Sequence, residues 1–175
     1  MKTTVILDLE WTSWKYNVDR KWQKKEIIQI GAIKINNKYK IIGEINIYVK
    51  PKFNPILSNY IKKLTGITQN KIDNNGLPFK KAYEKFNIFS KNSKIISNGV
   101  DGKIIKENLK YYNLKKKIKI KNIRPLLINK YKIPKKFINS AIIHTFFGYK
   151  LNKKHSHNAI WDCKCILKAL KNLNF

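Results

Sequence analysis

The stretch TTVILDLEW occupies residues 3–11 and joins a run of β-branched and apolar side chains to two acids. The apolar part predicts a buried β-strand. Side chains two positions apart on a strand point to the same face, so Asp8 and Glu10 are expected side by side at its end. One interpretation is a solvated strand end, since charged residues are usually exposed. The other is a hard-cation site, because Mg²⁺ and Mn²⁺ prefer carboxylate oxygens.

The segments that follow this strand predict an α/β fold, with a mixed β-sheet of about five strands flanked by helices. EIIQIGAIKI (26–35) and KYKIIGEINIYVK (38–50) are typical of a β-hairpin that turns at residues 36–38. No internal repeat, linker or shift in composition divides residues 1–175, which indicates a single domain. The remaining expected elements are strands at 94–98 and 117–123, the second at a sheet edge, and helices at 56–66, 77–90, 102–113 and within 124–147, where Pro125 and Pro134 break them.

The chain of 175 residues carries a formal charge of +28 and is 43% hydrophobic. The hydrophobic content indicates a globular protein. No apolar run approaches the ~20 residues of a membrane span, and MKTTVILDLEW is more typical of a first strand than of a signal peptide. The charge favours a polyanionic partner such as nucleic acid. Lys, Asn and Ile are all abundant, however, as in a genome biased toward A and T, so solvated surface lysines are the alternative.

Cys163 and Cys165 lie two positions apart on a predicted helix, where their side chains face different ways. They are a poor disulfide pair, which predicts a reducing, cytoplasmic location. Together with His155 and His157 they offer nitrogen and sulfur ligands for zinc. This alternative is weak, because structural zinc needs ligand pairs that converge.

Three further polar residues stand where chemistry is plausible. Asp101 follows a predicted strand and opens a predicted helix, so it is either an N-cap or a site residue. In HSHNAIWDC (155–163), five residues of helix would turn His157 and Asp162 about 140° apart. The two share a site only if His157 precedes the helix and Asp162 lies in its early turns. Ser156 or Asn158 is expected to cap that helix.

In this order the acids and the histidine resemble the DEDDh, or DnaQ-like, 3′→5′ exonucleases of the ribonuclease-H-like fold. The residues that carry the resemblance are Asp8 and Glu10 in LDLEWT, Asp101 in SNGVDGKII, and His157 and Asp162 in HNAIWD. Residues 48–73, with LTGIT at 64–68, are similar to the Eri-1-like 3′ exoribonuclease subgroup. The resemblance covers nearly the whole chain. Residues 124–154 carry no motif of the family, and Trp11 and Cys163 fill positions where smaller residues are common.

The resemblance implies a two-metal reaction with Mg²⁺ or Mn²⁺, in which Asp8 bridges the metals and the other three acids complete their ligands. It implies that His157, whose ordinary pKa of about 6.5 lies near working pH, is the general base. The expected substrate is single-stranded or 3′-overhanging nucleic acid, with RNA favoured over DNA, and the products are nucleoside 5′-monophosphates. A DNA exonuclease and a non-catalytic RNA-binding protein are the alternatives. The expected substrate-binding residues are Trp11, Thr12, Leu64, Thr65 and Asn98.

Overall fold

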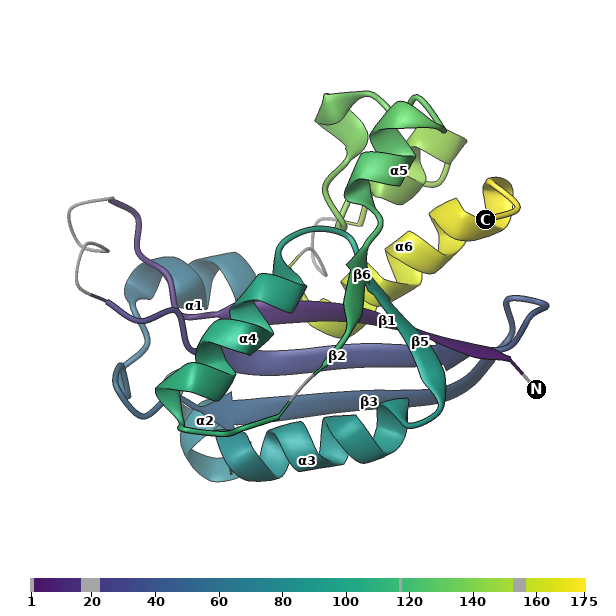
Figure 1. The fold of residues 1–175 in the computed structure, drawn as a ribbon. Helices are drawn as coiled ribbons and strands as arrows, with labels where there is room; N and C mark the ends of the chain where they lie inside the picture. Colours follow the sequence, from purple (N-terminus) through teal and green to yellow (C-terminus); the bar gives the residue numbers. More distant parts are fainter. Residues whose placement is uncertain (1, 17–22, 117, 153–156) are drawn as a thin grey trace.

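The computed structural model describes residues 2–16, 23–116, 118–152 and 157–175. Within them, six strands form one mixed sheet in the order β4-β3-β2-β1-β5-β6 (Figure 1). The strands are β1 (Thr3–Trp11), β2 (Ile27–Ile35), β3 (Ile41–Lys50), β4 (Leu77–Pro78), β5 (Ser93–Ser97) and β6 (Ile120–Asn122). The helices are α1 (Asn59–Thr65), α2 (Gln69–Asn75), α3 (Phe79–Ser90), α4 (Asp101–Tyr111), α5 (Arg124–Asn129) and α6 (Ala159–Asn172), with 3₁₀ turns η2 (Lys135–Phe137) and η3 (Ile143–Phe147).

The strand that carries the two acids lies inside the sheet. β1 pairs antiparallel with β2 and parallel with β5. Every residue from Val5 to Glu10 is buried, as the apolar sequence predicts. The end of β1 therefore meets the end of β5, and the acids on β1 stand next to the turn that leads into α4.

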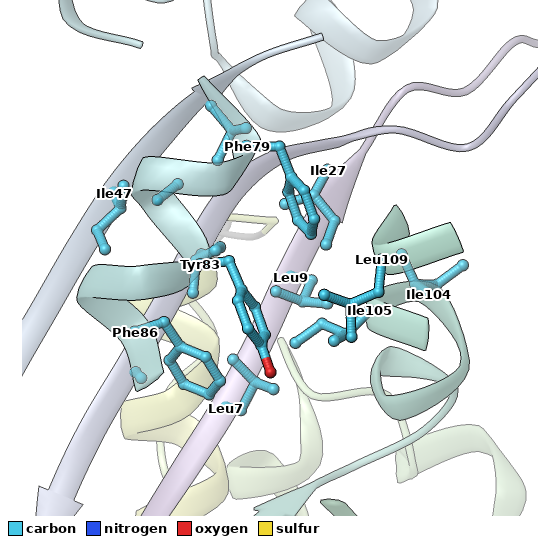
Figure 2. Close-up of a cluster of buried hydrophobic side chains, with 14 of the residues drawn as sticks. Leu7, Leu9, Ile27, Ile47, Phe79, Tyr83, Phe86, Ile104, Ile105 and Leu109 are labelled. Atoms are coloured by element: carbon cyan, nitrogen blue, oxygen red, sulfur yellow. The ribbon is translucent and has the colours of Figure 1, made fainter. Parts of the chain in front are cut away.

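The two faces of the sheet have separate cores. Leu7 and Leu9 of β1 pack with Phe79, Tyr83 and other residues of α3 and with the apolar side of α4 (Figure 2). Ile6, on the opposite face of β1, packs with residues of α5, η3 and α6. Because side chains on a strand alternate between faces, Asp8 and Glu10 lie on the Ile6 side, which α6 covers.

A close backbone contact fixes the start of α6 against the sheet. Gly31 of β2 pairs with Asp8 of β1, and a Cβ atom at Gly31 would lie 2.5 Å from the carbonyl carbon of Ala159. Glycine is therefore needed at this position. The contact holds the first turn of α6 beside Asp8, which is what the site requires.

The expected architecture is confirmed, with three differences in detail. One is the helix α2, which lies between the helices expected at 56–66 and 77–90 and was not predicted. The sheet has six strands rather than about five, because Leu77 and Pro78, expected to begin a helix, pair with β3 before α3 starts at Phe79. Pro125 does not break a helix. It lies in the first turn of α5, where the missing N–H of proline costs nothing. Among the helices of the described residues, none combines the length and the apolarity needed to cross a membrane.

Candidate active site

Three elements place the four acids at one point. Asp8 and Glu10 project from β1, and each is 7% exposed. Asp101 is the first residue of α4, and its Oδ1 accepts a hydrogen bond from the backbone N–H of Leu9 at 3.2 Å. Asp162 lies in the first turn of α6 and is 3% exposed. The cap of α4 is Val100, so Asp101 is not the N-cap and its carboxylate is turned toward β1.

The histidine reaches this cluster because it stands outside the helix. Asn158 caps α6 by accepting a hydrogen bond from the backbone N–H of Trp161 at 3.3 Å. His157 precedes the cap with a φ of 58°, a conformation that turns the chain sharply. One ligand atom from each of Glu10, His157 and Asp162 lies within 4.8 Å of the other two. The structure thus brings the histidine and the acids together as expected, with His157 before the helix and Asp162 in its first turn.

Burial raises the pKa of every acid in the cluster, and repulsion from neighbouring acids adds to this for Asp8, Glu10 and Asp162. The pKa of Asp8 is raised well above its usual range by burial and then by the charges of Asp101, Asp162 and Glu10, and a hydrogen bond from Ser140 opposes this. Burial and the charges of Asp162 and Asp101 do the same to Glu10. The pKa of Asp101 is raised to about 6, chiefly by burial, and that of Asp162 to about 7 by burial and Asp101. Four buried acids therefore cannot all be ionised without a positive partner.

The cluster fits divalent cations. Oδ1 of Asp162 is buried and, within the described part of the chain, has no hydrogen-bond partner. A buried carboxylate oxygen without a donor is unusual in a folded protein, and a cation explains it. The donor set is mostly carboxylate, which suits Mg²⁺ or Mn²⁺ rather than zinc.

The zinc alternative is not supported by the cysteines. Both thiols are free and buried, and Sγ of Cys163 donates to the carbonyl oxygens of Ile6 and Gly31 at 3.4 and 3.3 Å. Burial raises the pKa of the Cys163 thiol well above its usual range, so it stays protonated and is a poor ligand. His155, one of the two histidines proposed as zinc ligands, lies outside the described residues, as does Ser156.

The raised pKa values predict how pH and metal change stability. In the metal-free protein, Asp101 and Asp162 hold protons up to about pH 6 and 7, whereas the unfolded chain releases them near 3.8. Stability present at low pH is therefore lost as pH rises through this window. We expect the melting temperature in EDTA to fall between pH 5.5 and 8, and Mn²⁺ to restore it at pH 8.

The matched variants for this measurement are Asp162→Asn, inside the cluster, and Glu84→Gln, an exposed acid on α3. Asp162→Asn should weaken both the fall with pH and the rise with Mn²⁺, whereas Glu84→Gln should leave both unchanged. Two outcomes would contradict the assignment of a metal site: a melting temperature in EDTA that rises steadily up to pH 8, or a melting temperature at pH 8 that does not change when Mn²⁺ is added.

The acids stand at the base of a cavity of about 400 Å³. Trp11, Thr12, Leu64 and Asn98, which the sequence assigns to substrate, all line it. Thr65 does not belong to the cavity wall. Its hydroxyl donates to the carbonyl of Ile61 at 2.8 Å and accepts from the N–H of Ile67 at 3.1 Å, so it shapes the end of α1.

Two of the expected substrate residues have their polar groups engaged within the protein. The Thr12 hydroxyl donates to the carbonyl of Lys24 and accepts from the N–H of Glu26, both at 3.0 Å. The Asn98 amide donates to the carbonyl of Ile138 at 2.8 Å, and its oxygen accepts from Arg124 at 3.4 Å. These two residues hold the wall in shape rather than offering free groups to a ligand.

Sequence reasoning missed several residues of the cavity wall. Arg124, Asn139 and Ser140 reach it from the segment after β6, and Tyr60 reaches it from α1. Residues 124–154 show no family motif, so no motif marks the first three. A usable signal existed only for Arg124, because it is one of two arginines among 38 basic residues.

A buried glutamate outside the cavity connects two of the loops near it by hydrogen bonds. Glu26, fully buried, accepts hydrogen bonds from the backbone N–H groups of Lys52 (2.6 Å), Phe53 (2.9 Å) and Asn54 (2.6 Å) and from the Tyr112 hydroxyl (2.7 Å). Its carbonyl also accepts from the N–H of Thr12 at 2.8 Å. Glu26 has no direct place in the cavity, yet it ties the loop after Glu10 to the loop after β3.

A buried cluster of acids with a histidine, at the end of an inner strand of a mixed sheet flanked by helices, defines the class of metal-dependent nucleases of the ribonuclease-H-like fold. Comparison with known proteins agrees. The sequence model of the exonuclease family, RNase_T, matches residues 5–170. The chain belongs to this exonuclease family, which confirms the prediction from the sequence.

Curated relatives include two proteins named for RNA or 3′-end cleavage. ERI1 exoribonuclease 2 of Xenopus laevis is 39% identical over 84 residues, which are 47% of this chain and 12% of that protein. The 3′-5′ exonuclease Snipper of Drosophila melanogaster is 34% identical over 106 residues, which are 60% of this chain and 37% of that protein. The chain thus spans much less than two thirds of the length of these relatives.

Solved structures show the same fold. The nuclease domain of 3′hExo, bound to rAMP, superposes with a TM-score of 0.87 at 24% identity, over 99% of this chain and 92% of that one. E. coli exonuclease I in complex with a dT13 oligonucleotide superposes with a TM-score of 0.77 at 12% identity, over 99% of this chain and 41% of that one. The mixed sheet flanked by helices is therefore that of the exonuclease neighbours.

Proposed function

We propose that the chain is a 3′→5′ exonuclease that hydrolyses phosphodiester bonds from the 3′ end of nucleic acid, RNA in preference to DNA, and releases nucleoside 5′-monophosphates. The observation that carries the proposal is the meeting of Asp8, Glu10, Asp101, Asp162 and His157 at the base of one cavity. The names of the curated relatives support the direction of cleavage and the RNA substrate.

The four acids would hold two divalent cations, Mg²⁺ or Mn²⁺. When bound, the cations activate the attacking water and neutralise charge on the phosphodiester. His157 takes one proton from that water, whose oxygen bonds to phosphorus. The bond from phosphorus to the 3′-oxygen of the preceding nucleotide breaks. That oxygen takes up a proton from solvent and becomes a hydroxyl, and His157 returns the proton that it accepted to solvent. Burial lowers the pKa of His157 below its ordinary value, so the imidazole is free to accept a proton at neutral pH.

Hydrolysis of a 5′-labelled oligonucleotide tests the proposed function. We expect a ladder that shortens from the 3′ end in Mg²⁺ and no change in EDTA, with 5′-monophosphates as the only small products. A circular oligonucleotide of the same sequence should remain intact. Binding without cleavage in Mg²⁺ or Mn²⁺ would favour the non-catalytic RNA-binding alternative, and cleavage of the circle would contradict an exonuclease.

The preference for RNA is a separate prediction. Discrimination needs a group that meets the 2′-hydroxyl, which both donates and accepts hydrogen bonds. Because the polar groups of Thr12 are engaged, the backbone and ring of Trp11 are the candidates beside Glu10. One buried hydrogen bond is worth roughly 1–3 kcal/mol, or about tenfold to a hundredfold. Matched single-stranded RNA and DNA should therefore differ at least severalfold in kcat/KM.

The DNA alternative has its own support. A DNA polymerase III of the PolC type from Caldanaerobacter subterraneus is 31% identical over 97% of this chain and 12% of that protein. Equal rates on the two sugars, or faster cleavage of DNA, would contradict the RNA preference and promote this alternative. We also retain the proposal of a cytoplasmic location, which the two free cysteines support.

A further inference from the structure

A second cavity, of about 520 Å³, adjoins the first between α4 and β6. Gly99 and Val100 line both cavities, so the two adjoin at the turn before Asp101. Val100 is 52% exposed and stands at the boundary. The wall on α4 consists of Lys103, Lys106, Glu107 and Lys110, and the opposite wall includes Ile120 and Asn122. We call this second cavity the α4–β6 groove.

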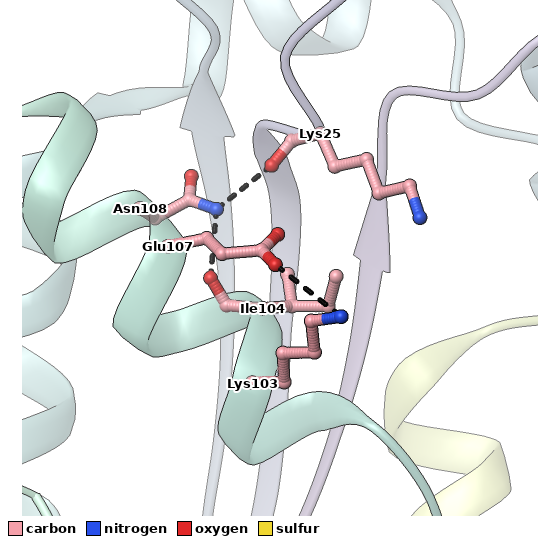
Figure 3. Close-up of polar contacts among 5 residues, drawn as sticks. All are labelled: Lys25, Lys103, Ile104, Glu107 and Asn108. Carbon is pink, nitrogen blue, oxygen red and sulfur yellow. Dashed lines mark hydrogen bonds and ion pairs between the residues drawn. The ribbon is translucent and has the colours of Figure 1, made fainter. Parts of the chain in front are cut away.

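The basic side of α4 is fixed toward the groove. On the inner side of the helix, the buried Asn108 donates to the carbonyl oxygens of Lys25 (2.8 Å) and Ile104 (2.9 Å) (Figure 3). Its side-chain oxygen also accepts from the N–H of Ile27 at 3.0 Å. These bonds set the rotation of the helix. Lys103 and Lys110 lie on the outer face of the helix. Because the rotation of the helix is fixed, their outward position is fixed as well.

The lysines of the groove are largely uncompensated. The Lys103 ammonium lies 3.9 Å from a Glu107 oxygen, and its side chain is 75% exposed. An exposed pair at this distance holds neither side chain strongly. Lys106 and Lys110 are exposed and have no ion pair in the described residues. The groove therefore carries an excess of positive charge, directly beside the cavity that the acids line.

An arginine of the active-site cavity lies against the turn that the groove shares. The Nη2 group of Arg124 donates to the carbonyl of Asn98 at 2.7 Å. A Cβ atom at Gly99 would come within 3.0 Å of this Nη2, so the guanidinium lies against the turn that both cavities share. A planar guanidinium suits phosphate, with which it forms paired hydrogen bonds.

We propose that the α4–β6 groove binds the sugar-phosphate backbone of the nucleotides that precede the scissile bond. This inference rests on the proposed function, since the 3′-terminal nucleotide must occupy the acidic cavity. Seven residues of helix separate Lys103 from Lys110, a rise of about 10 Å. At roughly 3.4 Å per stacked nucleotide, the groove accommodates about three nucleotides of a single strand. The exposed side chain of Val100 lies between the terminal nucleotide and these three.

The test compares two triple variants of equal charge. Lys103→Gln/Lys106→Gln/Lys110→Gln removes the lysines of the groove. Lys38→Gln/Lys40→Gln/Lys91→Gln removes three exposed lysines at the other end of the sheet, where the β2–β3 turn and the start of β5 lie. Each protein is assayed on a single-stranded RNA 12-mer and on the dinucleotide that ends it.

For the groove variant we expect kcat/KM on the 12-mer to fall at least about tenfold and kcat/KM on the dinucleotide to stay within about twofold. The control variant should match the wild type on both substrates. Binding of the labelled 12-mer in Ca²⁺ gives a readout without cleavage. The slope of log affinity against log salt should become shallower by about 2 in the groove variant, as expected for three lost phosphate contacts on a single strand.

The results separate the two proposals. Groove and control variants that behave alike on the 12-mer, with an active wild type, would overturn the groove and leave the exonuclease in place. An equal loss on the dinucleotide would also overturn it, since the lysines would then act on the acidic cavity itself. A wild-type protein that cleaves neither substrate would overturn the proposed function and, with it, the role of the groove.

Discussion

Asp8→Asn protein is expected to hydrolyse a single-stranded oligonucleotide at least about a thousandfold more slowly than the wild type while keeping its fold. The substitution preserves the shape of the side chain and removes one negative charge. Asp8 is the acid whose charge interacts with all three others of the cluster. Without this carboxylate the protein binds the cations less well, which removes several kcal/mol of charge stabilisation in the transition state. Each 1.36 kcal/mol corresponds to a tenfold change in rate.

The structure predicts that Asp8→Asn does not lower the thermal stability of the metal-free protein, although it lowers the activity. A buried carboxylate whose pKa is raised opposes folding once it ionises, so Asp8→Asn should melt no lower than the wild type in EDTA at pH 8. In Mn²⁺ the order should reverse, because the variant gains less from the metal. Single-turnover rates and melting curves, with Glu84→Gln as the control, check both halves. Near-normal turnover by Asp8→Asn would contradict the assignment of the active site.

Long, regular elements of this fold could be predicted from the sequence. β1, the β2–β3 hairpin and α6 each carry many apolar residues at one clear spacing, so local pattern and tertiary structure agree. β4 could not be predicted, because two residues carry no periodicity and Pro78 argues against a strand. The position of Pro125 in the first turn of α5 was open to two interpretations, since proline either ends a helix or begins one.

The same reasoning explains which parts of the site were predictable. Spacing within one strand singled out Asp8 and Glu10, and spacing around one helix cap singled out His157 and Asp162. Asp101 was noted for its place between a strand and a helix, and only the resemblance to the DEDDh exonucleases joined the five residues into one site. Arg124 and Ser140 reach the cavity only because the segment after β6 folds back over the end of β1, and no local pattern encodes that path. Thr12 was assigned to substrate by its position next to Glu10. In the folded protein its hydroxyl is hydrogen-bonded to the backbone of Lys24 and Glu26, which lie more than ten residues away in the sequence.

His157→Ala protein is expected to lose about 10²–10⁴-fold in kcat, the usual contribution of a general base. His157 also lies within ligand distance of Glu10 and Asp162, so a role in holding a cation is the competing explanation. The two roles differ in what survives the substitution. If His157 is the base, Mn²⁺ should still raise the melting temperature of His157→Ala, and added imidazole should restore part of the rate.

The pH dependence of the rate gives an independent check. Burial lowers the pKa of His157, so the neutral imidazole is present above that lowered value and is lost as pH falls through it. With metal at saturation, the wild-type kcat should therefore decline on the acid side at a pH below 6.5, the ordinary value for histidine. His157→Ala should show no such decline over the same range. Loss of the Mn²⁺ effect on melting, together with failure of imidazole to restore any rate, would instead identify His157 as a ligand, and the proton of the attacking water would need another acceptor.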